Sequence, residues 1–75
     1  NPRRATVKTG QKKIDLHDYE GAISDFTEAI ELDPNNIIAY SERARAKSYL
    51  KDHQGEIEDL KKIIEIEPNF APAYN

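Results

Sequence analysis

The most constraining feature of this 75-residue sequence is an internal repeat with a period of 34 residues. Residues 10–41 align with residues 44–75 and share 12 identities in 32 positions, where ordinary composition would give roughly two by chance. The identical pairs are Lys13/Lys47, Leu16/Leu50, Asp18/Asp52, Gly21/Gly55, Ile23/Ile57, Asp25/Asp59, Ile30/Ile64, Glu31/Glu65, Pro34/Pro68, Asn35/Asn69, Ala39/Ala73 and Tyr40/Tyr74. A fixed period of this size is typical of stacked units, so the sequence predicts an array rather than a domain with an enclosed pocket.

The second half of each unit has the clearest helical pattern. Apolar residues in 19–33 recur at spacings of three and four, which predicts a helix there. The segment between Asp52 and Pro68 repeats this pattern. Asp18 is the expected N-cap of the first of these helices, and Pro34 cannot continue it. We therefore expect two equivalent helices that begin and end at equivalent residues.

A further helical segment precedes each of these helices. It covers about residues 4–16 in the first unit and 36–50 in the second, and only a few residues separate it from the helix that follows. The short linkers contain no glycine, although His17 and Lys51 can take the required turn conformation at modest cost. Each unit is thus predicted to be an antiparallel helix hairpin, and the fold class to be all-α.

Composition narrows the classes of function. The chain has no cysteine and two isolated histidines, His17 and His53, so we expect no disulfide, metal or other cofactor. No apolar run approaches the roughly 20 residues that span a bilayer, and the first residues lack a secretory apolar segment. The expected location is cytoplasmic. Because the chain starts at Asn1 and stops inside a third copy of the unit, we expect it to be a fragment.

Period, hairpin and the closing residues Asp33, Pro34 and Asn35 together make the sequence resemble the tetratricopeptide repeat family. The strongest match comprises Asp18, Tyr19, Glu20, Ala22, Ile23, Phe26, Ala29, Ile30, Leu32, Asp33 and Pro34. The resemblance implies an α-α superhelix in which the two alanines allow close helix approach and the phenylalanine fills the space between units. It divides the single domain 1–75 into repeat 1 at about 3–36, repeat 2 at about 37–70 and a truncated third repeat at 71–75.

The sequence also departs from the family pattern in two places. Thr6, Thr9 and Lys13 replace a large aromatic residue, a leucine and a tyrosine, so the first helix has a weak apolar face. In the second unit Glu56 and Ile63 replace the two alanines. We therefore expect the second hairpin to pack less closely, with Glu56 turned toward solvent.

Charges alternate with the repeat, although the formal net charge is only −3. The net charges are +5 for residues 1–14, −7 for 15–35, +2 for 36–53 and −3 for 54–75. The resemblance implies that first helices line a concave groove, which would then be mildly basic and bind an acidic peptide or protein. The family's groove positions fall on Arg4, Val7, Gln11, Ile14, Ile38, Ser41, Arg45 and Ser48, with Tyr49 as an addition.

Within this set we predict peptide binding at Arg4, Gln11, Ser41, Arg45 and Ser48. An arginine holds a carboxylate through two parallel hydrogen bonds, which favours the two arginines as anchors. The alternative for each residue is that it merely solvates a helix surface. Glu42 stands where a carboxylate-binding member would place an asparagine or arginine, which argues against a chaperone-tail ligand.

Enzymatic and nucleic-acid functions find little support. Acidic pairs such as Asp15 with Asp18 occur at helical spacing by abundance alone, and the sequence has no phosphate loop or activated nucleophile. The basic first segment has no interleaved aromatic residues, and the pI is about 5.3. We therefore expect no catalysis, no nucleic-acid partner and no membrane partner.

A second interpretation is structural, with the two repeats acting as spacers in a longer solenoid. Helix 54–67 carries more apolar residues than one shared face can use, and no complete unit follows. We expect self-association through an exposed stripe formed by Ile57, Leu60, Ile63 and Ile64, or coverage of this stripe by residues 70–74. The sequence does not decide between the adaptor and spacer interpretations.

Overall fold

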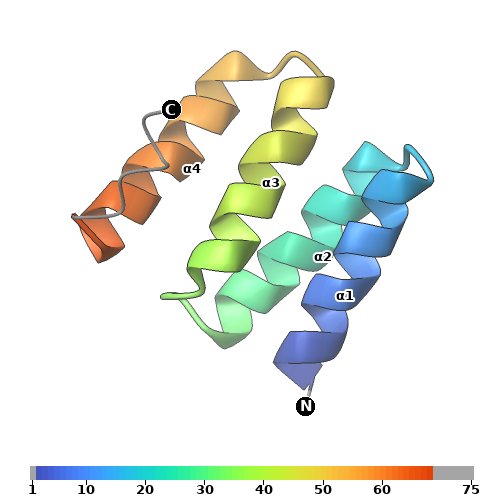
Figure 1. Cartoon of the computed structure of the whole chain (residues 1–75), viewed down its shortest axis with the longest axis horizontal. Helices are drawn as coiled ribbons and strands as arrows, with labels where there is room; N and C mark the ends of the chain where they lie inside the picture. Colours follow the sequence, from blue (N-terminus) through green and yellow to red (C-terminus); the bar gives the residue numbers. More distant parts are fainter. Residues whose placement is uncertain (1, 69–75) are drawn as a thin grey trace.

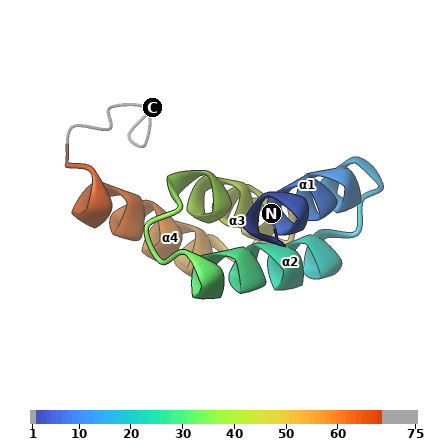
Figure 2. The ribbon, with the colours of Figure 1, turned by 90° about the horizontal axis from the view of Figure 1, so that it is seen from below.

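The computed structural model describes the backbone of residues 2–68 and the side chains of residues 6–68. Its helices are α1 (Pro2–Asp15), α2 (Tyr19–Leu32), α3 (Ile37–Tyr49) and α4 (His53–Ile66). They form two antiparallel hairpins in succession, and α2 of the first packs against α3 of the second (Figure 1). Seen from the side, α1 and α3 lie together above α2 (Figure 2). The predicted all-α fold of repeated hairpins is confirmed.

Equivalent caps begin the second helix of each hairpin. The carboxylate of Asp18 accepts a hydrogen bond from the amide of Gly21 at 3.1 Å, and Asp52 accepts one from Gly55 at the same distance. Each cap satisfies an amide that has no partner within its helix. The N-cap predicted at Asp18 is therefore present, and its copy recurs one repeat later.

The two hairpin turns also share one geometry. His17 and Lys51 have φ values of 65° and 64°, so both occupy the left-handed region, as predicted. In each turn the next residue's amide bonds a carbonyl five residues back: Asp18 to Lys13 at 2.8 Å and Asp52 to Lys47 at 2.9 Å. This arrangement is a Schellman motif, which usually places glycine at the left-handed position. The chain closes both turns without glycine, at a conformational cost of about 1–2 kcal/mol each.

Phe26 lies at the centre of the core. Its fully buried ring clusters with Ile14, Ala22 and Ala46, which come from α1, α2 and α3. A Cβ atom added to Gly10 would lie 2.6 Å from the ring, so α1 approaches α2 through a residue without a side chain. The prediction that this aromatic residue fills the space between units is confirmed.

The second hairpin uses larger contact residues. Ile63 is 0 % exposed and occupies the position that Ala29 occupies in the first hairpin. The predicted place of Ile63 in an exposed apolar stripe is therefore wrong, because this side of α4 faces α3. Glu56, at the other substituted alanine position, keeps 30 % of its side chain exposed and lies 3.5 Å from the His53 ring nitrogen Nδ1.

Candidate peptide-binding surface

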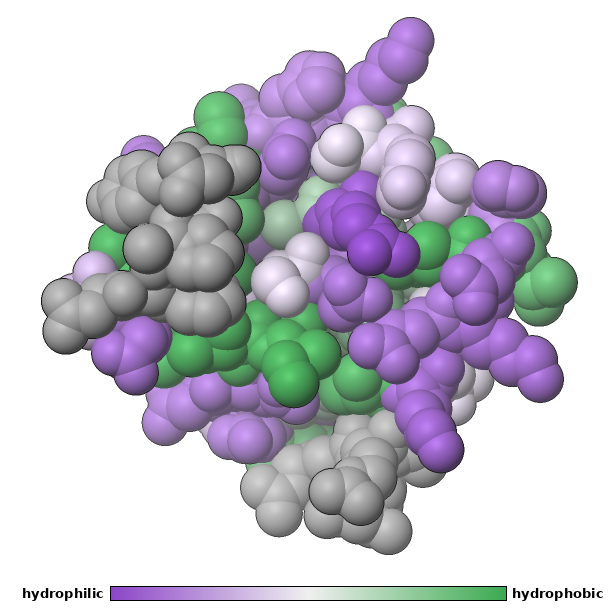
Figure 3. Space-filling view, viewed as in Figure 1, coloured by the Kyte–Doolittle hydropathy of each residue, from purple (hydrophilic) through white to green (hydrophobic). Residues whose placement is uncertain are grey.

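The exposed side of α1 and α3 forms one continuous surface, which we call the α1/α3 face. Its members are Gln11, Ile38, Ser41, Arg45, Ser48 and Tyr49. Figure 3 views the molecule from this side and shows polar side chains over α1 and apolar side chains over the beginning of α3. On α3 the spacings of three, four and seven residues bring these side chains onto one side of the helix.

Arg45 is the cation that α3 leaves available on this face. Its side chain is 53 % exposed, and its Nη1 atom lies 3.8 Å from Oε1 of Glu42, one helical turn earlier. The Glu42 side chain is only 16 % exposed, but the long separation makes the contact weak, and ion pairs that are open to solvent stabilise a protein by at most about 1 kcal/mol. The guanidinium can therefore exchange Glu42 for the carboxylate of a ligand, to which it can form two parallel hydrogen bonds.

The other two cations of α3 serve the inside of the second hairpin. Arg43 donates from Nε and Nη2 to the carboxylate of Asp59, and Nζ of Lys47 lies 3.2 Å from the same carboxylate. The hydrogen bond to Asp59 raises the pKa of Arg43 above its usual value. Asp59 therefore offsets one unit of the net charge of +2 counted for residues 36–53, and both cations that contact it lie inside the second hairpin. The α1/α3 face is less basic than the sequence count indicates.

The structure places the predicted site residues as follows. Gln11 and Arg45 are exposed, whereas Ser41 and Ser48 are partly buried. The Ser41 hydroxyl donates to the carbonyl of Ile38 at 3.1 Å. The backbone of Arg4 belongs to α1, but its side chain lies outside the described residues.

One groove position was predicted wrongly. Ile14 is only 5 % exposed and belongs to the core cluster around Phe26. Val7 is partly buried and packs against the same cluster. The apolar character of Ile14, at the position equivalent to Ser48, was the available signal that this position had become part of the core.

Sequence reasoning missed an aromatic pair between the repeats. The rings of Tyr19 at the start of α2 and Tyr49 at the end of α3 stack with centroids 4.6 Å apart and planes 19° from parallel. The hydroxyl of Tyr19 is 2.8 Å from Nδ1 of His17. Because the two tyrosines occupy non-equivalent positions in different repeats, the internal repeat gives no indication of this contact.

The described part of the chain offers neither a metal site nor a membrane span. Residues 6–68 contain no group of three or more histidine, cysteine or acidic side chains arranged to hold a metal ion. None of the four described helices combines the length and apolar character required to cross a membrane.

Comparison with known proteins gives a consistent family match. Residues 10–36 and 37–70 each match the family model described as Tetratricopeptide repeat. The chain is also similar to the small glutamine-rich tetratricopeptide repeat-containing protein beta of Rattus norvegicus, Mus musculus and Homo sapiens. Identity is 44 % over 41 residues in each case, which covers 55 % of this chain and 14 % of the relative. The matched region is thus a small part of each relative's length.

Proposed function

This chain belongs to the tetratricopeptide repeat family, whose repeats are generally protein-interaction modules, and we propose that its α1/α3 face binds an extended acidic segment of a partner protein. The observation that carries the proposal is Arg45, which is half exposed and held only by a long contact to Glu42. The other two cationic side chains of α3, Arg43 and Lys47, both contact Asp59.

Gln11 complements Arg45 from the neighbouring repeat. The two residues occupy equivalent positions, 34 residues apart, on α1 and α3. The glutamine amide can donate to and accept from a peptide backbone, whereas the guanidinium only donates. A ligand that crosses both helices would therefore meet a backbone contact at Gln11 and a carboxylate contact at Arg45.

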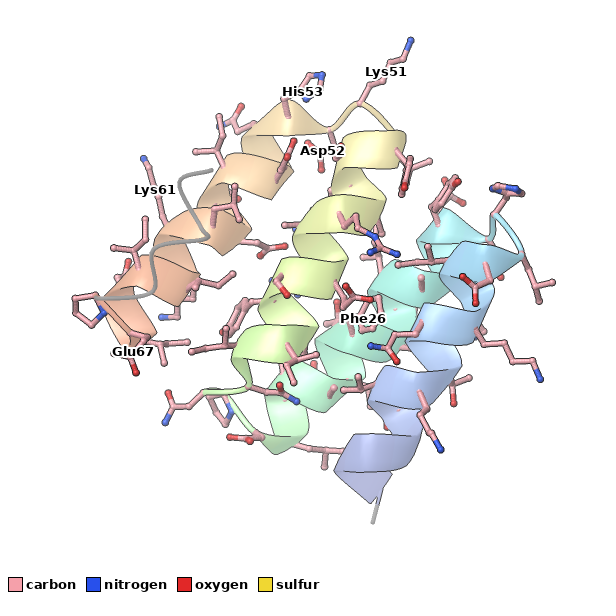
Figure 4. All side chains as sticks on the ribbon, viewed as in Figure 1. Phe26, Lys51, Asp52, His53, Lys61 and Glu67 are labelled. Carbon is pink, nitrogen blue, oxygen red and sulfur yellow. The ribbon has the colours of Figure 1, made fainter. Side chains whose placement is uncertain are left out.

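The test is a fluorescence anisotropy titration with two labelled peptides. One peptide contains aspartates separated by glycine and serine, and the other replaces each aspartate with asparagine. We expect Arg45→Gln to weaken binding of the acidic peptide about tenfold, the range expected for a charged hydrogen-bond pair. The matched control is Lys61→Gln on α4, which removes the same charge from a side chain pointing away from α1 and α3 (Figure 4). Equal binding of both peptides, or equal losses in both variants, would refute the proposal.

A second candidate function is the stacking role, and the outer side of α4 favours it. Ile57 is 52 % exposed and Leu60 is partly exposed. They are equivalent to Ile23 and Phe26 of α2, which pack in or against the core cluster that includes Ala46 of α3. On α4, Ile57 and Leu60 therefore stand at the positions through which α2 packs against the hairpin that follows it. The proposed stripe consists of Ile57, Leu60 and Ile64, without Ile63.

Self-association through this stripe would pair two α4 helices. A head-to-tail stack is disfavoured because α1 carries the exposed Lys12 at the position equivalent to the buried Ala46. Sedimentation velocity over a range of concentrations should show a dimer that Ile57→Glu abolishes and Lys61→Glu does not. A monomer at every concentration would refute this role. Residues 70–74, the other predicted cover for the stripe, lie outside the described residues.

A further inference from the structure

Tyr49 lies one helical turn beyond Arg45 on the α1/α3 face and is backed by the ring of Tyr19. We infer that this tyrosine pair is a second anchor of the face and selects ligands with an aromatic side chain two residues away from an acidic one. The inference rests on the proposed function, since it assigns the ligand class of the same face. It adds a residue that the acidic-peptide proposal does not require.

The exposed ring of Tyr49 is preorganised by its neighbours. Tyr49 is 53 % exposed, yet its ring stacks on Tyr19 at a centroid distance of 4.6 Å. Tyr19 is itself fixed by its contact with His17, whose ring meets it edge-on with centroids 5.8 Å apart. A ring held in this way loses little rotational freedom when a ligand binds. Rigid tyrosines of this kind often dominate the binding energy of protein interfaces.

The spacing of Arg45 and Tyr49 matches that of alternate residues in an extended peptide. Arg45 and Tyr49 are four residues apart on α3, which corresponds to a rise of about 6 Å. In an extended peptide, residues i and i+2 point to the same side and are roughly 6.6 Å apart. An extended ligand laid along α3 can therefore place an acidic side chain at Arg45 and its second neighbour at Tyr49.

The ligand residue at Tyr49 must suit both the tyrosine ring and the nearby guanidinium of Arg45. The face of a tyrosine ring attracts either another aromatic ring or a cation. A ligand cation at Tyr49 would lie one turn from the guanidinium of Arg45, and like charges at that distance repel. An aromatic residue avoids this repulsion and buries apolar area against the ring. The geometry therefore favours an aromatic side chain over lysine or arginine.

The anchor also defines a single register. The position equivalent to Tyr49 in the first repeat is Asp15, and the position equivalent to Tyr19 in the second is His53. Within residues 6–68 the stacked pair therefore occurs once, between the two repeats. A ligand should accordingly carry one motif in which a single residue separates an acidic residue from an aromatic one. Peptides with the two orders of this motif show in which direction the ligand runs along α3.

The experiment is an anisotropy titration with short labelled peptides of matched length. The probes contain Asp-Gly-Phe, its reverse Phe-Gly-Asp, and Asp-Gly-Ala as the reference, with Asp-Phe and Asp-Gly-Gly-Phe as spacing controls. We expect one of the two orders to bind about tenfold tighter than the reference. The two spacing controls should bind like the reference, because their phenylalanine cannot reach Tyr49 while the aspartate contacts Arg45.

Variants then assign the gain to Tyr49. Tyr49→Ala and Tyr49→Leu should remove the tenfold gain, so that the phenylalanine peptide binds no tighter than the reference. Leu32→Ala should preserve the gain, because Leu32 is an exposed apolar residue of α2 outside the α1/α3 face. Circular dichroism establishes that each variant is folded, and the leucine variant retains apolar packing against Tyr19. A gain that is absent in the wild-type protein, or that survives both Tyr49 variants, overturns the inference. If no peptide binds, or if Arg45→Gln affects none of them, the proposed function itself fails.

Discussion

Arg43 on α3 donates two hydrogen bonds to the carboxylate of Asp59 on α4, from Nε at 2.9 Å and from Nη2 at 2.6 Å. Its remaining Nη1 donates to the hydroxyl of Thr27 on α2 at 3.1 Å. One guanidinium therefore joins the two helices of the second hairpin and connects them to the first. Lys47 adds a second cation to the same carboxylate, which is only 4 % exposed.

We predict that Asp59→Asn destabilises the chain by about 3 kcal/mol, because it leaves two largely buried cations without a countercharge. The matched control is Asp25→Asn in the first hairpin. Asp25 Oδ2 lies 3.0 Å from Nζ of Lys13, but this ion pair is more exposed than the one at Asp59. Its loss should cost only about 1 kcal/mol. Urea unfolding followed by circular dichroism compares the two variants, and equal losses would contradict the assigned role of Asp59.

The same contact predicts a flat pH response. The hydrogen bond to Asp59 raises the pKa of Arg43. A raised pKa contributes stability that is complete below the ordinary arginine value and is lost only above the raised one. The difference in unfolding free energy between wild type and Asp59→Asn should thus stay constant from pH 6 to about pH 10. A steady decline over that range would show that another group controls the contact.

Local features of this fold could be predicted from the sequence because the repeat doubles each signal. Asp18 and Asp52 both precede a helix, and His17 and Lys51 occupy matching turn positions. N-capping and left-handed turn geometry depend on a few neighbouring residues, so they follow from local patterns. All four residues adopt the expected roles in the structure.

Contacts between helices were less accessible to sequence reasoning. A charge count cannot distinguish Arg43, which faces α4, from Arg45, which faces solvent. The sequence did contain a signal for the ion pair between Lys47 and Asp59. Both residues are identical to their counterparts in the first repeat, Lys13 and Asp25, which also form an ion pair. The burial of Ile63 also had a signal, because its counterpart Ala29 stands where the family resemblance implies a contact between paired helices.

Gly10 and Phe26 form a size-matched pair, which yields a prediction about packing. In the second repeat the equivalent residues are Ala44 and Leu60. The glycine is thus replaced by a larger residue where the phenylalanine is replaced by a smaller one. Phe26 is fully buried at the centre of the molecule (Figure 4). Gly10→Ala should destabilise the chain by about 1–2 kcal/mol despite the better helix propensity of alanine.

The double variant Gly10→Ala with Phe26→Leu tests the same idea. It recreates the pair of the second repeat. The double variant should therefore lose about 1 kcal/mol less unfolding free energy than the sum of the losses in the two single variants. Thermal unfolding of the four proteins completes the cycle. Strict additivity would mean that the added methyl group does not meet the phenylalanine ring.

Lys51 offers a stabilising substitution. It is exposed and holds a φ of 64°, which a side chain disfavours and glycine does not. Lys51→Gly should raise the unfolding free energy by about 0.5–1 kcal/mol after the larger entropy loss of glycine on folding is included. Lys51→Ala keeps a Cβ atom and should give no gain. His17→Gly should gain less than Lys51→Gly, because it also removes the contact with Tyr19. Melting temperatures decide the order, and an unstabilised Lys51→Gly would contradict the strain assigned to this turn.

Glu42 should act as an internal competitor for the ligand of Arg45. Its carboxylate lies 3.8 Å from the guanidinium and would repel an acidic side chain that approaches the same group. Glu42→Gln should therefore tighten binding of the acidic peptide about threefold at low salt. The gain should fall toward zero near 1 M salt, where the screening length is about 3 Å. Glu58→Gln removes the same charge from an exposed position on α4 and serves as the control in calorimetric titrations. If both variants bind equally tightly, the effect comes from net charge, and Glu42 does not regulate Arg45.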